Sequence, residues 1–294
     1  MTEPDEIPPG TRIGRYRVVS TLGRGGMGGV MEVEDDTGAR YALKAPVQDI
    51  EGIDVTRRFA REANVLRMLD HPNLVSAVDV FTEGGRLYLV MEKVTGEPLS
   101  RALDFGELHP RRALVLTRQA LAGIGHAHAQ GLIHRDLKPD NILLVDMGGW
   151  ERVKIIDFGI VKLTSDVAAA FGAEALTSTG IVFGTPRYMA PEQALGQLLD
   201  TRADLYALGI ILYEMLAGRP PFEFDDPVAM LKAHAKSPPP PLAAVTGNAP
   251  WCTRELVALV EGALAKKPDQ RFASAEVMTA VLDEAFRSLE GVCP

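Results

Sequence analysis

The sequence predicts an α+β fold in which a small antiparallel β-sheet part precedes a larger helical part. Residues 15–45 read as short strands joined by turns, and residues 86–94 add another strand. From about residue 98 the pattern changes to helices. With 294 residues, of which 46% are hydrophobic, the chain can bury a large core. We therefore expect two lobes with a cleft between them.

The strands of the first part alternate with turns. They are expected at Tyr16–Val19, Val30–Val33 and Tyr41–Lys44, with a turn at 35–38 before the last. A helix is expected over about 56–69, because Phe59, Ala63, Leu66 and Leu69 recur at helical spacing. This helix separates the early strands from the strand at 86–94.

The helices of the second part have recognisable ends. Pro110 suits the first position of a helix that extends to His128 and stops at Gly131. The segment from Asp204 to Ala217 is apolar nearly all round and ends at Gly218, which predicts a buried central helix. Residues 238–241 form a proline run that we interpret as a surface loop, with a proline-motif docking site as the alternative.

Composition excludes several classes of protein. The chain has 31 basic and 39 acidic residues and a net charge of −8, so it has no basic footprint for nucleic acid or an anionic membrane. Its two cysteines make no disulfide framework, which favours a reducing cytoplasm. The longest apolar run, 205–213, is too short for a membrane helix, and the acidic N-terminus does not resemble a signal peptide.

A glycine-rich segment follows the first strand. Its pattern is Gly23-x-Gly25-x-x-Gly28-x-Val30, and it runs into a second strand rather than into a helix. This context is unlike a Rossmann loop and favours a hairpin flap whose backbone closely approaches phosphate oxygens. An ordinary glycine-rich hairpin is the alternative.

A lysine and a glutamate in the first part are candidates for an internal ion pair. Lys44 ends an apolar strand, and Glu62 flanks the apolar stripe of the helix at 56–69. A carboxylate on an inward helix face needs a cation to offset its desolvation. Lys44 can supply that cation and also meet ligand phosphates, although a solvated lysine and a surface pair remain alternatives.

The most specific motif is His134-Arg135-Asp136-Leu137-Lys138-Pro139-Asp140-Asn141. It is followed by Asp157-Phe158-Gly159 after a strand at 153–156, and later by Ala190-Pro191-Glu192. With these motifs the sequence resembles a eukaryotic-type (Hanks-type) Ser/Thr protein kinase of the bacterial branch over residues 14–289. The resemblance implies a bilobal protein-kinase fold, with an N-lobe at 14–94, a C-lobe at 95–289, and tails at 1–13 and 290–294.

The resemblance implies roles for the polar residues of these motifs. Asp136 would orient the substrate hydroxyl and accept its proton, and Lys138 would neutralise the migrating phosphoryl group. Asn141 and Asp157 would bind Mg²⁺, with Mn²⁺ as an alternative ion. Lys44, fixed by Glu62, would hold the α- and β-phosphates of ATP. Leu22, Val30 and Ala42 would cover the base from above and Leu143 from below, with Met91 as gatekeeper and Glu92 to Val94 as hinge.

Three residues depart from the family pattern. Gly29 stands where relatives carry a larger residue and should loosen the phosphate flap. Pro46 removes a ladder donor soon after Lys44 and should end that strand. Lys93 places a charge in the hinge. None of the three removes a catalytic group, but together they bear on nucleotide affinity.

The resemblance also bears on substrate and regulation. In this family a lysine two residues after the catalytic aspartate marks Ser/Thr kinases, and Lys138 and Thr185 fit that pattern. Arg135 suggests control by phosphorylation, and Thr177 and Thr179 have the spacing of acceptors in the loop before Thr185. A plain polar loop is the alternative. Protein substrates are the implied partners, and a homodimer would allow autophosphorylation.

Other motif residues have structural roles by resemblance. His134 and Phe158 would stack with Leu66 in an apolar spine, Asp204 would accept backbone hydrogen bonds from the catalytic loop, and Arg271 would pair with Glu192. The expected location is cytoplasmic, either as this chain alone or as the catalytic part of a longer membrane-anchored protein. The alternatives to an active kinase are a kinase-shaped scaffold that acts by binding partners, and a small-molecule kinase of related fold.

Overall fold

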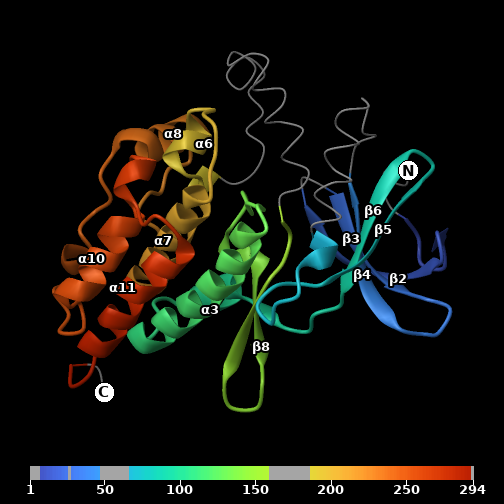
Figure 1. Cartoon of the computed structure of the whole chain (residues 1–294), viewed down its shortest axis with the longest axis horizontal. Coiled ribbons are helices and arrows are strands. Elements are labelled where there is room, and N and C mark those ends of the chain that lie inside the picture. The colour runs from blue at the N-terminus through green and yellow to red at the C-terminus, as the bar shows by residue number, and fades with distance from the viewer. Residues whose placement is uncertain (1–6, 26–27, 47–65, 159–185, 293–294) are drawn as a thin grey trace. The chain divides into compact units, whose positions relative to one another are not determined.

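The computed structural model describes residues 7–25, 28–46, 66–158 and 186–292, and Figure 1 draws the others as a grey trace. Within those ranges the chain divides into two compact units. The first contains residues up to 71 and residues 75–95, and the second contains residues 72–74, 96–158 and 186–292. Each unit is described below by itself.

The first unit is built on a six-stranded antiparallel sheet. Its strand order is β1-β2-β3-β4-β6-β5, so one crossover places β6 between β4 and β5. The strands are β1 (Arg12–Ile13), β2 (Tyr16–Gly25), β3 (Gly28–Glu34), β4 (Arg40–Pro46), β5 (Ala77–Glu83) and β6 (Arg86–Glu92). The predicted strands at 16–19, 30–33 and 41–44 fall within these elements, and the strand predicted at 86–94 corresponds to β6, which ends at Glu92.

One face of this sheet carries the core of the first unit. Side chains alternate between the two faces of a strand, and the buried cluster takes every second residue. Its members are Ile13, Tyr16, Val18, Met31, Val33, Leu43, Tyr88 and Val90. The stacked rings of Tyr16, Phe81 and Tyr88 extend the cluster. The intervening residues, among them Val30, Ala42 and Lys44, therefore lie on the opposite face.

Part of the segment assigned to a tail lies against this core. The Gly10 amide donates to the Val18 carbonyl at 2.8 Å, and β1 pairs with the start of β2. Ile13 is buried and Ile7 packs against the same cluster. Residues 7–13 thus contribute to the folded first unit.

The second unit consists mainly of helices, most of which are labelled in Figure 1. Its α-helices are α2 (Leu99–Leu103), α3 (Pro110–Ala129), α6 (Pro191–Ala194), α7 (Arg202–Ala217), α8 (Pro227–Lys236), α9 (Leu242–Val245), α10 (Arg254–Ala263) and α11 (Ala275–Ser288). A small antiparallel sheet of β7 (Glu97–Pro98), β8 (Ile142–Asp146) and β9 (Glu151–Ile155) accompanies them. Single 3₁₀ turns lie at Pro139–Asn141, Pro186–Tyr188 and Pro268–Gln270.

Helix α7 is the centre of this unit. Every residue from Ala203 to Leu216 is buried, because α3, α9 and α10 pack around the helix. Gly209 permits the approach of α10, since a Cβ there would lie 2.7 Å from the Ala263 Cβ. The helix ends at Gly218, whose φ of 70° lies in the left-handed region. The predicted buried helix is confirmed, and so is the helix that begins at Pro110.

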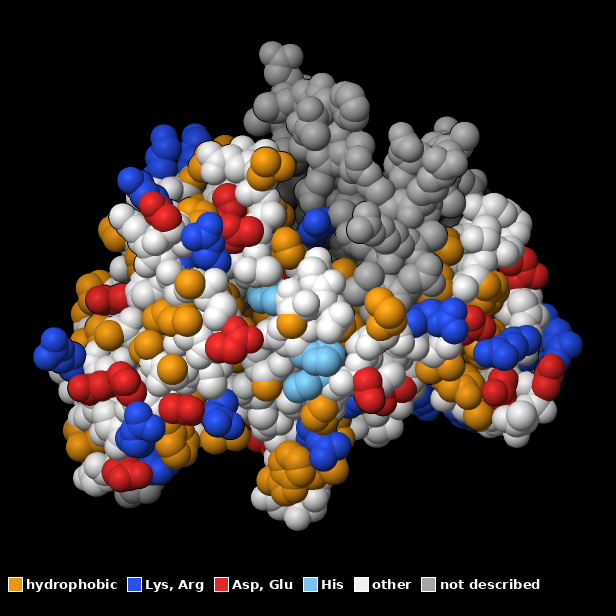
Figure 2. All heavy atoms as spheres, in the orientation of Figure 1, with side chains coloured by type: hydrophobic (Ala, Val, Ile, Leu, Met, Phe, Trp, Pro, Cys, Tyr) orange, Lys and Arg blue, Asp and Glu red, His pale blue; other side chains and the backbone are white. Residues whose placement is uncertain are grey.

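The surface of the described residues is mixed in charge. Figure 2 shows basic and acidic side chains interspersed over the face in view. Residues 238–241, the proline run, form a surface loop between α8 and α9. Among the helices that the structure describes, none has the length and apolar character needed to span a membrane.

Candidate active site

The segment 134–141 forms a loop between α3 and β8, and a buried aspartate of α7 holds its start. The Asp204 carboxylate accepts from the backbone amides of His134 at 2.8 Å and Arg135 at 2.9 Å. Its Oδ2 also lies 2.8 Å from His128 Nε2 of α3. Burial alone would raise the pKa of Asp204, but the contacts with His128 and the His134 amide outweigh it and hold this pKa below its ordinary value. The predicted role of Asp204 is confirmed.

His134 is a buried neutral link between two parts of the site. Its Nε2 lies 2.9 Å from the Ile156 carbonyl, which can only accept, so Nε2 carries the proton. Its Nδ1 accepts from the Asp136 amide at 3.3 Å. Burial lowers the pKa of the imidazole, and its ring packs on that of Phe158 with centroids 4.7 Å apart. His134 is therefore a packing residue, as the sequence predicted.

The candidate base, Asp136, and its neighbour Lys138 lie side by side. Lys138 Nζ is 3.7 Å from Asp136 Oδ2, and both side chains are mostly buried. Asn141 Nδ2 donates to the Asp136 carbonyl at 2.8 Å, which fixes the turn between them. The loop thus brings a carboxylate, an ammonium group and an amide oxygen to one place.

Asn141 and Asp157 can offer oxygen ligands to a cation. The Asn141 amide nitrogen is committed to Asp136, so its Oδ1 is the atom it presents. The Ile156 amide donates to the Asn141 carbonyl at 2.9 Å, which places Asp157 one residue beyond this contact. Two oxygen donors suit Mg²⁺, which keeps several waters and binds substrate phosphates. Within the described ranges no group of three or more His, Cys, Asp or Glu could hold a metal by itself.

Two residues of this site have backbones in the left-handed region. Arg135 has φ 67° and Asp157 has φ 60°, conformations that are uncommon for residues other than glycine. Such strain persists only where the surroundings enforce it, and it concentrates at functional sites. Here Asp204 holds the Arg135 amide, while Gln193 Nε2 of α6 donates to the Arg135 carbonyl at 3.0 Å. The backbone of Arg135 is therefore held at both its amide and its carbonyl.

Most of the other predicted site residues lie in the first unit. Sheet pairing sets Gly23 opposite Val30, Val30 opposite Lys44, and Ala42 opposite Met91. Val30, Ala42 and Lys44 therefore share the face opposite the core. Gly25 and Gly28 pair at the end of the β2–β3 hairpin, which confirms that the glycine segment runs into a strand. Pro46 is the last residue of β4, as expected.

The residues expected as hinge are the last residue of β6 and the two that follow it. The Glu92 amide donates to the Ser76 carbonyl, and Glu92 Oε1 accepts from the Ser76 amide, both at 2.9 Å. Lys93 Nζ contacts Glu32 Oε1 of β3 at 2.8 Å. Met91 is buried, Val94 is half-buried and Leu22 is 47% exposed. Leu143 is half-buried on β8 in the second unit.

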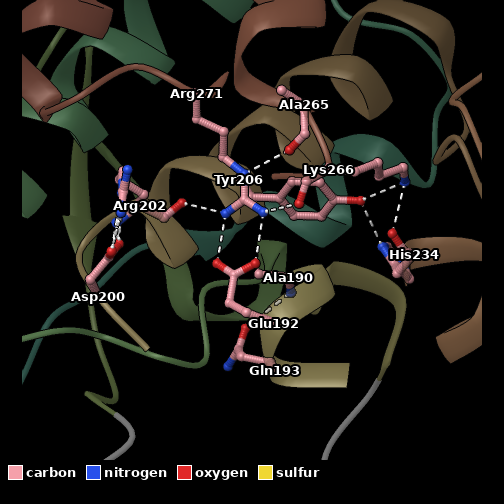
Figure 3. Close-up of polar contacts among 10 residues, drawn as sticks. All are labelled: Ala190, Glu192, Gln193, Asp200, Arg202, Tyr206, His234, Ala265, Lys266 and Arg271. Atoms are coloured by element: carbon pink, nitrogen blue, oxygen red, sulfur yellow. Dashed lines mark hydrogen bonds and ion pairs between the residues drawn. The ribbon is translucent and has the colours of Figure 1, made fainter. Parts of the chain in front are cut away.

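A buried arginine joins three segments of the second unit (Figure 3). Arg271 pairs with Glu192 of α6 through two contacts of 2.7 Å, as predicted. Its remaining N–H groups donate to the carbonyls of Ala265 at 2.7 Å, Lys266 at 3.0 Å and Arg202 at 3.1 Å. All five guanidinium N–H groups are thus used, and the guanidinium also lies over the Tyr206 ring at 4.8 Å.

The same network contains a histidine and a lysine of unusual pKa. Lys266 Nζ donates to the His234 carbonyl at 2.8 Å, and Tyr206 Oη lies 3.1 Å from His234 Nδ1. Burial lowers the pKa of His234 to about 4, and the nearby Lys266 charge adds to this effect. Burial likewise lowers the pKa of Lys266 to about 8.

We expect His234 to make the protein sensitive to acid. The unfolded histidine binds a proton below pH 6.5 and the folded one only near pH 4, so the free energy of unfolding falls by about 3 kcal/mol across that window. Replacing His234 with Phe removes this term. Urea unfolding of both proteins from pH 7 to 4.5 should show that the free energy of unfolding falls more in the wild type than in His234→Phe. An equal fall in both proteins would contradict the assignment.

Three predicted site residues, Glu62, Thr177 and Thr179, lie outside the described residues, and so do Gly159, Thr185 and residues 56–65 of the expected helix. Sequence reasoning also missed contacts that the structure reveals. Gln193 holds Arg135, Tyr188 Oη donates to Glu214 at 2.8 Å, and Glu32 binds Lys93. Of these, only Lys93 carried a signal, as an unusual charge in the expected hinge.

The sheet unit, the helical unit and the anchored loop together define a protein kinase. The family model for the protein kinase domain matches residues 16–282. The chain belongs to the protein kinase family. The α+β protein-kinase fold predicted from the sequence is therefore confirmed.

The relatives found are bacterial Ser/Thr protein kinases. The chain is 41% identical to Pkn1 of Myxococcus xanthus over 280 residues, which is 94% of this chain and 39% of that protein. It is 40% identical to PknA of Mycobacterium tuberculosis over 272 residues, 90% of this chain and 59% of that protein. It is 38% identical to PrkC of Bacillus subtilis over 281 residues, 94% of this chain and 41% of that protein. The chain spans about two to three fifths of these relatives.

A solved structure of a bacterial kinase domain also resembles this chain. The crystal structure of the Mycobacterium tuberculosis PknI kinase domain superposes with a TM-score of 0.74 at 26% identity. The match covers 95% of this chain and 100% of that domain. The likeness therefore extends over both units.

Proposed function

We propose that this chain transfers the γ-phosphoryl group of ATP to Ser and Thr hydroxyls of proteins. The observation that carries the proposal is the loop anchored by Asp204, which sets Lys138 Nζ 3.7 Å from the Asp136 carboxylate. The named Ser/Thr kinases among the relatives support the choice of acceptor. That the physiological substrates are proteins, and that any longer protein containing this chain acts as a kinase, is part of the same proposal.

The chemistry follows from where charge develops. Asp136 orients the acceptor hydroxyl and takes its proton as the new O–P bond forms. Lys138 is close enough to Asp136 to neutralise charge on the phosphoryl group during transfer. Asn141 and Asp157 would hold Mg²⁺, which would supply positive charge to the phosphates of ATP. The loop thus supplies positioning and charge stabilisation.

The residues proposed to bind ATP come from both units. In the first unit, Lys44 holds the α- and β-phosphates with Glu62 as its partner, while the backbone of Gly23, Gly25 and Gly28 approaches the phosphates. Leu22, Val30, Ala42, Met91 and the backbone of Glu92 and Val94 contact the base. Leu143 contributes an apolar contact from the second unit. The shared face of Val30, Ala42 and Lys44 supports this assignment.

A radiolabel assay tests the proposal. The protein is incubated with γ-labelled ATP, Mg²⁺ and a generic protein substrate, and the labelled product is hydrolysed for phosphoamino acid analysis. We expect label on Ser and Thr, and none when EDTA removes the metal. A protein that binds ATP but transfers no label would be a kinase-shaped scaffold. Label found on small molecules alone would indicate a small-molecule kinase.

Activation by autophosphorylation is a further part of the proposal. Arg135 follows the anchored His134 and has a backbone fixed from both sides, so a phosphate that pairs with it would be held in place. We expect mass spectrometry of protein incubated with ATP to find phosphate on Thr177 or Thr179. The double variant Thr177→Val, Thr179→Val should lose most of its activity. Fully active protein without phosphate at 177–179 would contradict this.

The domain boundaries and cellular location stay predictions. The catalytic domain is proposed to span residues 14–289, with the boundary between its N-lobe and C-lobe near residue 95 of the sequence. A cytoplasmic location and a homodimer that allows autophosphorylation are also proposed. A time course of autophosphorylation at two enzyme concentrations tests the homodimer, since reaction between copies accelerates with concentration.

A further inference from the structure

A buried carboxylate in the first unit gathers three partners from different segments. Glu32 of β3 is only 6% exposed. Its Oε1 lies 2.8 Å from Lys93 Nζ and 2.7 Å from Arg40 Nη1, and Ser20 Oγ donates to its Oε2 at 3.3 Å. One negative charge thus meets two positive charges, which no single helix or strand pattern in the sequence predicts.

The position of this cluster relates it to the proposed ATP residues. Glu32 pairs across the sheet with Ala42, which pairs in turn with Met91. Because side chains alternate along β3, Glu32 shares the sheet face of Val30. The cluster therefore lies in the same row, and on the same face, as residues proposed to contact the base.

Lys93 differs from the other partners of Glu32. Ser20 and Arg40 belong to β2 and β4, the strands on either side of β3, so ladder hydrogen bonds already fix their backbones. Lys93 lies beyond the end of β6, in the segment whose backbone is proposed to bind the base. Ser76 holds Glu92, the preceding residue, through two hydrogen bonds. The Lys93 contact with Glu32 therefore ties the next residue of that segment to β3.

We propose that the Glu32–Lys93 ion pair is a positioning device that sets the backbone of residues 92–94 for binding the adenine of ATP. This inference rests on the proposed function. Lys93 and Glu32 act through that backbone and touch neither the phosphates nor the reacting atoms. Contacts with Lys93 first, and then with Arg40, lower the pKa of Glu32 to about 2, so the carboxylate is ionised throughout the neutral range.

The variant Lys93→Met tests the proposal, because it removes the charge and keeps the length of the side chain. We expect the KM for ATP to rise about five- to tenfold, with kcat and the KM for the protein substrate within twofold of wild type. The inhibition constant of adenosine should rise by the same factor as the KM for ATP. Adenosine carries no charge, so its loss of affinity reports on the base-binding backbone.

Two further variants complete the experiment. Lys93→Arg, which can still reach the carboxylate, should restore most of the affinity for adenosine. Arg17→Met removes an exposed cation that pairs with Glu34 in the same sheet, and it should change neither constant. Thermal unfolding of all variants checks that the first unit stays folded.

Several outcomes would overturn the proposal. A higher KM for ATP with unchanged adenosine inhibition would mean that Lys93 acts only through its charge on the phosphates. Unchanged constants for both ligands would mean that the ion pair does not position the segment. If Arg40→Met and Lys93→Met change the KM for ATP and the inhibition constant of adenosine equally, the charge balance around Glu32 matters and the position of residues 92–94 does not depend on Lys93 in particular. If the wild type binds adenosine but transfers no phosphate, the proposed function is wrong. The adenosine affinities of wild type and Lys93→Met would then still decide whether the ion pair positions the segment.

Discussion

We expect Asp136→Asn to lower kcat for phosphoryl transfer by about 10²- to 10⁴-fold, the usual contribution of a general base. The amide keeps the size of the side chain but cannot take the hydroxyl proton. The loop should keep its shape, because the amides of His134 and Arg135 bind Asp204 and the Asp136 carbonyl binds Asn141. Affinity for ATP should therefore stay within about threefold of wild type. Steady-state kinetics and nucleotide titration of the same preparations measure both quantities.

Asp146→Asn is the matched control for this change. Asp146 ends β8 and accepts from the Gly148 amide at 2.8 Å, on an exposed turn of the same unit. The identical chemical substitution there should leave kcat unchanged. Should Asp136→Asn transfer phosphate as fast as wild type, Asp136 is not the base and the mechanism is wrong.

The second large effect concerns stability. We expect Arg271→Met to lower the free energy of unfolding of the second unit by about 3–5 kcal/mol, because it strands the Glu192 charge in a buried site. Glu192 is 3% exposed, and its two contacts with Arg271 are both 2.7 Å. Arg271→Lys should also be clearly destabilising, since an ammonium group has three N–H donors for the five acceptor contacts in Figure 3. Chemical unfolding followed by circular dichroism measures both losses.

Arg118→Met serves as the control. Arg118 pairs with Asp283 at 2.8 Å, but both side chains are well exposed, so the loss should stay below about 1 kcal/mol. Equal losses in Arg118→Met and Arg271→Met would show that burial of the Arg271 pair adds nothing. A double variant Glu192→Gln, Arg271→Met should lose less than the sum of its single changes, because it leaves no unpaired charge.

The elements with local signals were predictable. Pro110 and Gly131 bracket α3, and the unbroken apolar run of α7 stops at a glycine that adopts positive φ. The catalytic loop was predictable as well, because its motif is a continuous run of residues. Its support by Asp204 followed from the family resemblance, and the hydrogen bonds confirm it.

Contacts between segments that are distant in sequence were not predictable. Lys93 and Glu32 are separated by 61 positions, and neither belongs to a motif. Tyr188 and Glu214 meet only because the 3₁₀ turn at Pro186–Tyr188 packs on α7. The sequence predicts residues 7–13 as part of a tail, because their packing depends on the aromatic cluster of the sheet, which no local pattern signals. Tertiary geometry determines each of these cases.

The burial of α7 on all sides has a consequence for how the protein is made. Synthesis proceeds from the N-terminus, so α7 emerges before α10 and α11, which complete the cover of this unit. At 5–20 residues per second, about 4–14 s separate residue 217 from residue 288. Until α10 has been made, the apolar side of α7 that packs on α10 has no partner. A nascent chain paused between α7 and α10 should therefore depend on chaperones more than one paused after α3.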